Sequence, residues 1–316
     1  MTLREEARKQ VLAYLARTGL TAGQFALRIG YARRSITQFM SSAQYGDSAG
    51  DETARNLIAY IGEHPPRAPR LPGTLWPTEN VRIIDSMIAR ARRGLWGLVF
   101  GPPASQKSFV FKYRFAENCQ KHLQPTMALI YASAQLTPPA LMRRISIAFG
   151  VYALGGFDSL RNEVIETLKE RTPKPVLIVD EAQHLAKQQV TLEIIREVGD
   201  EAEIGLIIAG HDSLKSTVFA SNGALKEYWL SRITAERRLP GLQDEEVKGI
   251  VRREMGTQSE AMMGKIVKAC SADYAGQHYL SPRRLDHILK ELKEMKDSRA
   301  GSVDAAIRTA QQIEAA

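Results

Sequence analysis

Short apolar runs alternate with amphipathic stretches through the middle of the chain. The apolar runs, which have the continuous hydrophobicity of strands buried on both faces, are LWGLVF (95–100), TMALIY (126–131), PVLIVD (175–180) and IGLIIAG (204–210). The amphipathic stretches between them, with apolar residues at helical spacing, cover residues 108–119, 138–149, 159–171 and 187–199. Strands that alternate with helices predict an α/β fold, in which a mostly parallel sheet is covered by helices on both faces.

The pattern changes on either side of this segment. Residues 64–77 (HPPRAPRLPGTLWP) contain five prolines, which cannot continue a helix, so we expect an extended linker there. After Leu239-Pro240-Gly241 the apolar runs stop, and helical spacing returns at 243–256, 259–271, 281–298 and 303–314. The predicted domains are a head (1–64), a linker (65–77), an α/β core (78–240) and an all-helical C-terminal domain (241–316).

Within the head, residues 21–42 (TAGQFALRIGYARRSITQFMSS) have the spacing of two short helices joined by a tight turn. Thr21 is suited to cap the first helix, Gly30 to make the turn, and the small Ala26 to let the helices approach closely. The apolar positions expected to join the pair are Phe25, Ala26, Ile29, Ile36 and Phe39. The polar and basic face left on the second helix consists of Arg33, Arg34, Ser35, Thr37 and Gln38. Such a helix-turn-helix is typical of major-groove DNA binding, and a helical hairpin with a solvated or protein-binding face fits the same pattern.

The loop after the first predicted strand has the pattern of a phosphate-binding loop. Gly101, Lys107 and Ser108 supply the strand-exit glycine, the lysine and the hydroxyl of the spacing GxxxxGK[ST]. Gln106 replaces the second glycine, and glycine tolerates backbone geometries that glutamine does not. The residues expected to contact a nucleotide are Gly101, Pro102, Pro103, Ala104, Ser105, Gln106, Lys107, Ser108 and Phe109. A strand, loop and helix with a chance lysine-serine pair is the alternative.

An acidic pair ends the third predicted strand. In PVLIVDEAQHL (175–185), Asp180 and Glu181 follow directly on apolar residues. Asp180 at such a strand end can hold Mg²⁺ together with the hydroxyl of Ser108, and Glu181 can orient and polarise an attacking water. The loop and the acidic pair occur in the expected order, each after a strand, and together they predict a P-loop ATPase.

Three further positions are suited to act on the γ-phosphate. His211 ends the fourth predicted strand, where it could sense the phosphate or position water. Arg232 could reach the nucleotide of a neighbouring subunit and neutralise transition-state charge. A Ser-Pro helix start places Arg283 or Arg284 near the nucleotide, and we favour Arg283. Each position also fits an ordinary strand-end or surface residue.

Composition and charge narrow the class of protein. Of the 316 residues, 44% are hydrophobic and 25% are charged, which is the balance of a globular protein. Lys and Arg outnumber Asp and Glu by 43 to 35, which favours a polyanionic partner. No apolar run reaches the roughly 18–20 residues of a membrane span, and MTLREEARKQ has no signal-peptide core, so we expect a cytoplasmic protein. Cys119 and Cys270 alone cannot build a disulfide framework or a cysteine metal site.

These motifs in this order resemble the AAA+ ATPases. The loop with Lys107-Ser108, LIVDEAQHL, LSRI (230–233) and the helical C-terminal part carry the resemblance. With TAGQFALRIGYARRSITQFM in front, the chain resembles the transposition ATPases typified by the B protein of phage Mu, over nearly its whole length. The resemblance implies a parallel sheet between helices, an N-terminal helix-turn-helix domain and a helical C-terminal lid domain.

The resemblance also assigns roles. Lys107 would bind phosphates, Ser108 and Asp180 would bind Mg²⁺, and Glu181 would be the catalytic acid. His211 would be the sensor of the γ-phosphate at the strand end. Arg232 would be the arginine finger that acts on the nucleotide of a neighbouring subunit, and Arg283 would be the sensor from the lid domain. Gln106 departs from the usual glycine, which bears on the rate of hydrolysis more than on nucleotide binding.

Members of that family bind ATP, assemble on double-stranded DNA as helical oligomers with little sequence preference, and deliver the DNA to a transposase. Hydrolysis, stimulated by DNA and transposase, disassembles the filament. The expected cofactors are therefore ATP and Mg²⁺, and the expected partners are duplex DNA, a transposase and further copies of the chain. Arg143 and Arg144 are candidates for the DNA side, or for a solvated helix face.

Other functions fit the same motifs. One is a DNA-binding scaffold whose altered loop binds ATP but scarcely hydrolyses it. Another is a transcription regulator, in which a nucleotide-binding body controls a helix-turn-helix head. A third is a loader of a replicative helicase.

Overall fold

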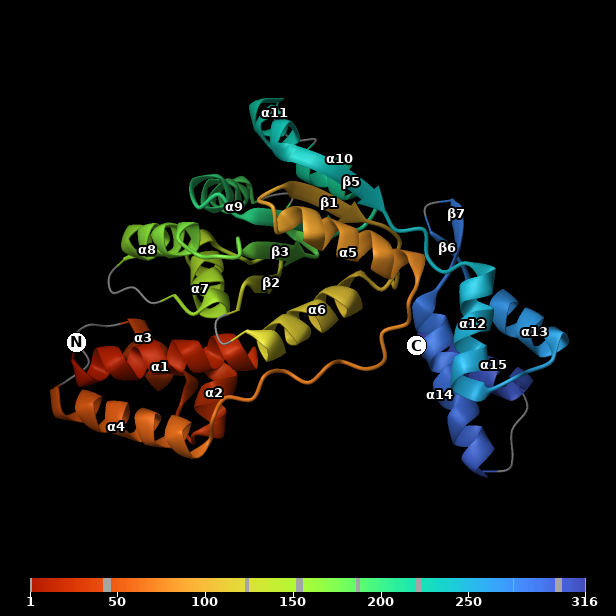
Figure 1. Cartoon of the computed structure of the whole chain (residues 1–316), viewed down its shortest axis with the longest axis horizontal. Helices are drawn as coiled ribbons and strands as arrows, with labels where there is room; N and C mark the ends of the chain where they lie inside the picture. Colours follow the sequence, from red (N-terminus) through yellow and green to blue (C-terminus); the bar gives the residue numbers. More distant parts are fainter. Residues whose placement is uncertain are drawn as a thin grey trace.

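A parallel five-stranded sheet forms the centre of the protein. The computed structural model describes residues 2–41, 47–122, 125–151, 156–185, 188–219, 223–274, 276–298 and 303–315. The strands run in the order β2-β3-β4-β1-β5 (Figure 1), and every neighbouring pair is parallel. They are β1 (Trp96–Phe100), β2 (Met127–Tyr131), β3 (Val176–Asp180), β4 (Gly205–Gly210) and β5 (Ile233–Arg238). The predicted α/β fold is confirmed.

Helices cover both faces of the sheet. One face carries α5 (Glu79–Ala91) and α6 (Lys107–Lys121), and the other carries α7 (Pro138–Phe149), α8 (Phe157–Lys169) and α9 (Gln189–Glu201). Successive side chains of a strand point to opposite faces. In β3, accordingly, Leu177 and Val179 pack with α7, α8 and α9, whereas Val176 and Ile178 pack with α5 and α6. Strands buried on both faces require the continuous apolar runs seen in the sequence.

Four of the five strands lie within the predicted runs, whereas β5 is not indicated by the hydrophobic pattern. Its sequence is ITAERR, and only Ala235 among its six residues is buried. In the described part of the chain β5 pairs with β1 alone, so it is an edge strand, and such a strand tolerates polar side chains. Two helices lie between β4 and β5, namely α10 (Leu214–Phe219) and α11 (Gly223–Arg232). A short 3₁₀ helix, η1 (Ala182–Leu185), follows β3.

The head is a cluster of four helices. They are α1 (Leu3–Thr18), α2 (Ala22–Arg28), α3 (Arg33–Ser41) and α4 (Asp47–Glu63). Thr21 caps α2 as expected, because its Oγ1 accepts a hydrogen bond from the backbone N of Gln24 at 3.2 Å, and Gly30 makes the turn with a φ of 73°. The fully buried residues of the α2–α3 pair are Phe25, Ala26, Ile36 and Phe39. Residue 42, the last of the predicted helix pair, lies outside the described residues.

The C-terminal elements, called the lid below, comprise four helices and one hairpin. The helices are α12 (Asp244–Met255), α13 (Glu260–Cys270), α14 (Pro282–Ser298) and α15 (Val303–Ala315). The prediction of an all-helical domain is wrong, because β6 (Ser271–Tyr274) and β7 (Gln277–Leu280) pair antiparallel. Each of these strands is only four residues long, and Leu280 alone among their residues is buried, so neither produces an apolar run. None of the described helices is long and apolar enough to cross a membrane.

The head packs against the end of α6. Arg17 of α1 donates from Nη1 to the carbonyl oxygen of His122 at 3.1 Å, and Sγ of Cys119 lies 3.8 Å from the carbonyl oxygen of Ala16. The proline-rich linker runs extended beneath α6, from the head toward the lid (Figure 1). Since α6 begins at Lys107, this helix connects the predicted phosphate loop to the head.

Candidate functional site

The loop between β1 and α6 wraps around the amino end of α6. A Cβ on Gly101 would lie 2.9 Å from the carbonyl oxygen of Leu239, so only glycine fits where the chain leaves β1. Lys107 and Ser108 are the first two residues of α6. Unpaired amides and the positive end of the helix dipole meet at a helix amino terminus, which makes this loop suited to bind an anion.

Lys107 is held inside the loop. Its Nζ donates to the carbonyl oxygens of Gly101 and Pro102, both at 3.0 Å, and to Oγ of Ser105 at 2.9 Å. Burial lowers the pKa of Lys107 to about 8, against the attraction of nearby carboxylates, chiefly that of Asp180. The ammonium group is therefore poorly hydrated and is stabilised by any further negative charge placed beside it.

Gln106 adopts the backbone conformation that glycine usually supplies at this position. Its φ is 69° and its ψ is −2°, in the left-handed region, which costs a non-glycine residue roughly 1–2 kcal/mol. The side chain points to the start of α5, where Oε1 accepts a hydrogen bond from Oγ1 of Thr78 at 2.9 Å. Thr78 is itself the cap of α5. The glutamine thus ties the loop to α5 while the loop keeps its left-handed turn.

Two substitutions of Gln106 are expected to differ in stability because of the backbone. Gln106→Gly relieves the left-handed strain and loses the bond to Thr78, and these two effects, each about 1 kcal/mol, nearly cancel. Gln106→Ala keeps the strain and loses the bond, so we expect it to be about 1 kcal/mol less stable than Gln106→Gly. Urea unfolding of both variants measures the difference. Equal stability would show that residue 106 is not left-handed in solution.

Asp180 places a buried carboxylate at the end of β3. Its Oδ1 accepts from the backbone N of Glu181 at 2.9 Å, whereas its buried Oδ2 has no hydrogen-bond partner among the described residues. Burial raises the pKa of Asp180, and the nearby side chain of Ser108 opposes that rise. An unpartnered carboxylate oxygen close to a hydroxyl fits a hard cation such as Mg²⁺, which prefers oxygen ligands. Ser108 therefore lies near Asp180, and their joint role in holding Mg²⁺ stays a prediction.

Glu181 lies beside Asp180 in a strained conformation. Its φ is 57°, which residues other than glycine rarely adopt. Such strained residues are often found at functional sites. Its Oε2 accepts a hydrogen bond from Nε2 of Gln183 and lies 3.7 Å from Nε2 of His211. Gln183 also accepts from the backbone N of His211 through Oε1, at 3.3 Å. Since β3 and β4 are neighbours, His211 lies close to Glu181, and Gln183 is hydrogen-bonded to both.

A cavity of about 720 Å³ opens between the loop, the strand ends and the lid. Its volume is within the range of small-molecule sites. The predicted site residues that line it are Pro103, Ala104, Ser105, Gln106, Lys107, Ser108, Phe109, Glu181, His211 and Arg283. Arg283 stands in the first turn of α14, whereas Arg284 donates from Nη1 to the carbonyl oxygen of Ser271 and does not line the cavity. The geometry therefore favours Arg283 over Arg284.

Hydrogen bonds anchor the lid on two sides of this cavity. On one side, Nε1 of Trp76 in the linker donates to Oε1 of Glu254 on α12 at 3.2 Å, and within the lid Nζ of Lys293 on α14 donates to Oε2 of the same carboxylate at 2.6 Å. On the other side, the hydroxyl of Tyr279 in β7 donates to the carbonyl oxygen of Pro103 at 3.1 Å. The β6–β7 hairpin of the lid is therefore bonded directly to the phosphate loop.

Arg232 lies outside the cavity. It ends α11 just before β5, at the amino edge of the parallel sheet, whereas the cavity is at the carboxyl edge. Its Nε pairs with Oδ1 of Asp200 at 2.6 Å, and its Nη1 donates to the carbonyl oxygen of Tyr228 at 3.3 Å. The arginine therefore does not contact a nucleotide held in the cavity of its own subunit.

The candidate DNA-binding residues lie in the head, and none of them lines the cavity. Those exposed on α3 are Arg33, Arg34, Thr37 and Gln38, and Ser35 beside them is half-buried. On α7, Arg143 and Arg144 are also exposed, and Nη1 of Arg144 donates to the carbonyl oxygen of Tyr131 at 2.8 Å. The two candidate DNA surfaces are thus on different helices from those that form the cavity.

The sequence patterns do not indicate three residues that make contacts around the site, namely Gln183, Tyr279 and Glu254. Gln183 stands two residues after Glu181 in LIVDEAQHL, and that position is the only local signal for it. Tyr279 and Glu254 belong to the lid, more than 140 residues from the loop in sequence, and no local pattern places them over the cavity.

Comparisons with known proteins agree with this geometry. Residues 90–218 match the family described as "AAA domain". The ORC2 protein of Aeropyrum pernix, in its ADPNP-ADP complexes, is similar in structure with a TM-score of 0.51 and 15% identity, over 76% of this chain and 69% of that one. Cdc6p of Pyrobaculum aerophilum has a TM-score of 0.51 and 15% identity, over 78% and 69% of the two chains. The ORC1 protein of A. pernix, solved in complex with DNA, has a TM-score of 0.50 and 19% identity, over 77% and 66%.

No curated protein sequence matches the chain. At 15–19% identity, the three solved structures show similarity of fold alone. The family match covers the segment from the end of α5 to α10. That segment contains the phosphate loop, the acidic end of β3 and the strands β1 to β4. Residues 90–218 of this chain are therefore similar to an AAA domain, and the fold around them is similar to that of the ORC2 and Cdc6p structures.

Proposed function

We propose that this protein is an ATP-dependent DNA-binding ATPase that assembles on duplex DNA with little sequence preference and delivers it to a transposase. The observation that carries the proposal is the division of the predicted ATPase residues between two places. Lys107, Glu181 and Arg283 line one cavity, whereas Arg232 lies at the opposite edge of the sheet. A site divided in this way is complete only when two copies of the chain meet.

The residues at the cavity support ATP hydrolysis. Lys107 and the amides at the start of α6 would hold the phosphates, and Ser108 and Asp180 would hold Mg²⁺, which neutralises charge on the outer phosphates. Glu181, held by Gln183, would orient a water molecule and accept its proton.

Arg232 is proposed to act on the nucleotide of the next subunit. In the single chain its guanidinium pairs with Asp200, so assembly has to exchange this partner for a phosphate. A contact between different surfaces of two copies is heterologous, and contacts of that kind build rings or helical filaments. ATP bound by one subunit and contacted by the next would therefore couple nucleotide occupancy to filament growth.

The head is proposed to contribute DNA contacts. The exposed Arg33, Arg34 and Gln38 on α3 offer groups for phosphates and base edges. Repetition of weak contacts along a filament multiplies their effect, which makes binding strong in the assembly and weak in the monomer. DNA affinity should accordingly depend on both ATP and salt.

ATP affinity is expected to fall as the pH rises above about 8. Lys107 has a pKa lowered to about 8, and bound phosphates would raise that pKa, so binding above this pH must take up a proton. The association constant should fall by up to about tenfold per pH unit above pH 8. Calorimetry in buffers of different ionisation enthalpy measures the proton uptake. Lys107→Ala should bind ATP weakly, and its ATP affinity should not fall in this way above pH 8. If that variant took up as many protons on binding ATP as the wild type does, another group would be the one that is protonated.

Electron microscopy of the protein with random-sequence duplex DNA tests the proposed function. Filaments are expected with a non-hydrolysable ATP analogue and not with ADP or without nucleotide. Filaments that form in ADP would contradict the coupling. Tight, nucleotide-independent binding of the protein to one operator sequence would instead favour a transcription regulator. Specific binding to a replicative helicase and not to a transposase would favour a helicase loader.

A further inference from the structure

The linker carries two arginines whose side chains are exposed. Arg67 and Arg70 are the only charged residues between 65 and 78, and neither guanidinium makes an ion pair within the described ranges. The prolines around them favour the extended polyproline conformation, which has three residues per turn and a rise of about 3.1 Å per residue. Residues three apart therefore fall on the same side, roughly 9 Å from each other.

The linker contacts both the head and α6. The carbonyl oxygen of Pro69, between the two arginines, accepts a hydrogen bond from Nε2 of Gln120 on α6 at 3.0 Å. The ring of Pro69 also lies 3.3 Å from where a Cβ on Gly19 would be, and Gly73 lies against the ring of Phe109. The arginines are thus presented by an ordered backbone, which reduces the entropy lost when they bind a partner.

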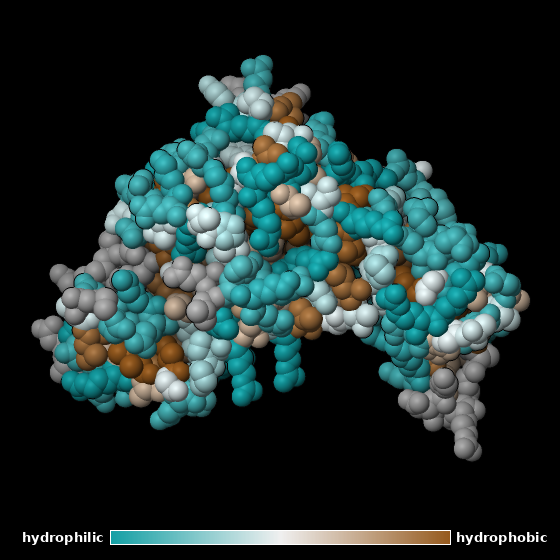
Figure 2. Space-filling view, in the orientation of Figure 1, coloured by the Kyte–Doolittle hydropathy of each residue, from teal (hydrophilic) through white to brown (hydrophobic). Residues whose placement is uncertain are grey.

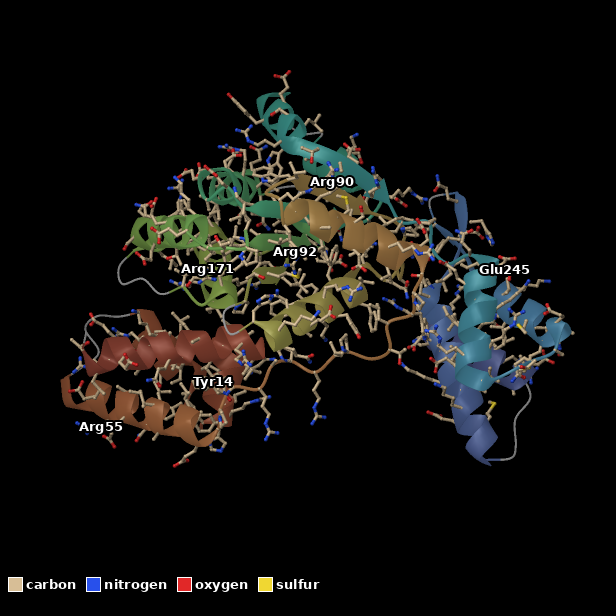
Figure 3. The ribbon with its side chains drawn as sticks, viewed as in Figure 1. Tyr14, Arg55, Arg90, Arg92, Arg171 and Glu245 are labelled. Atoms are coloured by element: carbon tan, nitrogen blue, oxygen red, sulfur yellow. The ribbon has the colours of Figure 1, made fainter. Side chains whose placement is uncertain are left out.

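Both arginines are exposed, and the linker carries side chains that project into solvent. Figure 2 shows long hydrophilic side chains that project from the concave underside between the head and the lid. Figure 3 shows nitrogen-tipped side chains projecting in the same direction from the linker ribbon. Two exposed cations, evenly spaced on an extended segment and without an acidic partner in the described part of the chain, are complementary to a regularly spaced polyanion.

We propose that Arg67 and Arg70 contact the phosphate backbone of duplex DNA, as a second DNA-binding element besides α3. This inference rests on the proposed function, in that it takes duplex DNA to be the partner, and it adds a surface that the helix-turn-helix does not include. Since the contact is to phosphates, it carries no sequence preference.

The other end of the linker lines the nucleotide cavity, through Pro72, Gly73 and Thr74. Arg70 is two residues away from Pro72, and the carbonyl of Pro69 is bonded to α6, the helix that starts at Lys107. A nucleotide in the cavity packs against one end of the linker and the start of α6, and so restricts the segment that holds the arginines. ATP is therefore expected to strengthen this DNA contact in addition to driving assembly.

The test is duplex binding by the double variant Arg67→Ala/Arg70→Ala, measured by fluorescence anisotropy with the non-hydrolysable ATP analogue over a series of salt concentrations. Each phosphate contact contributes about 0.9 to the slope of log K against log salt, so the slope should fall by about 1.8. Affinity near 0.1 M salt should fall at least about tenfold. Arg67→Lys/Arg70→Lys keeps the charges and should restore most of the slope.

The matched control is Arg252→Ala/Arg253→Ala, which removes two exposed arginines from α12 of the lid. It lowers net charge equally, so an equal loss of slope in the control would overturn the local contact. Wild-type binding together with unchanged binding by the linker variant would overturn this inference and leave the proposed function standing. No duplex binding by the wild type with any nucleotide would overturn both.

Trypsin gives an independent readout on the wild-type protein. Duplex DNA should slow cleavage after Arg67 and Arg70 by at least about tenfold relative to cleavage after Arg252 and Arg253, because bound phosphates cover the linker guanidinium groups. Equal protection at both pairs would contradict the contact.

Discussion

Glu181→Gln is expected to lower the rate of ATP hydrolysis by at least about 100-fold, because a general base contributes typically 10²–10⁴-fold. The amide has the size of the carboxylate but cannot accept a proton from water. ATP binding should remain within about threefold of wild type, since Lys107 and the loop amides hold the phosphates. Phosphate release measures the rate, and calorimetry measures the affinity.

Glu166→Gln is the matched control for this substitution, because Glu166 is exposed on α8 and lies outside the cavity. Its rate should equal that of the wild type. Gln183→Ala frees the carboxylate of Glu181 and should alter hydrolysis by less than Glu181→Gln does, since it removes only a positioning contact. Full hydrolysis by Glu181→Gln would transfer the role of the base to another group, and His211 would be the first to examine.

The central elements of this fold could be predicted because their signals are local. Each of the first four strands is an unbroken apolar run, since both of its faces are buried. The phosphate loop and the acidic pair each follow such a strand. Parallel strands bring their carboxyl ends to one edge of the sheet, so Ser108 and Asp180 had to lie close together.

The elements that could not be predicted depend on contacts between distant parts of the chain. β5 is polar because it lies at the sheet edge, and the β6–β7 hairpin is held over the loop by Tyr279 and Pro103. Gln106 shows a different limit of the sequence argument. Glutamine is expected not to tolerate the backbone geometry that glycine supplies, yet Gln106 has a left-handed φ of 69°. The left-handed turn persists with glutamine because Thr78 fixes its side chain and the start of α6 fixes its backbone.

Arg232→Ala is expected to lower the DNA-stimulated hydrolysis rate by about 10³-fold or more, the effect of removing an arginine finger. Binding of ATP to the monomer should be unchanged, because Arg232 does not line the cavity of its own subunit. Asp200→Asn is the matched control: it breaks the same ion pair but keeps the arginine. If Arg232 served only to stabilise the fold through this pair, both variants would lose activity together.

Mixing two inactive variants distinguishes action between subunits from action within one. In an equal mixture of Arg232→Ala and Glu181→Gln, some interfaces join an intact Glu181 to an intact Arg232 from the next subunit. Random head-to-tail assembly makes about one quarter of the sites complete, so hydrolysis should recover to about that fraction of wild type. Since each variant alone should be at least about 100-fold slower, this recovery is readily measured. A mixture no faster than the sum of its parts would place Arg232 outside the neighbouring site, and ATP would then have no direct role in joining the subunits.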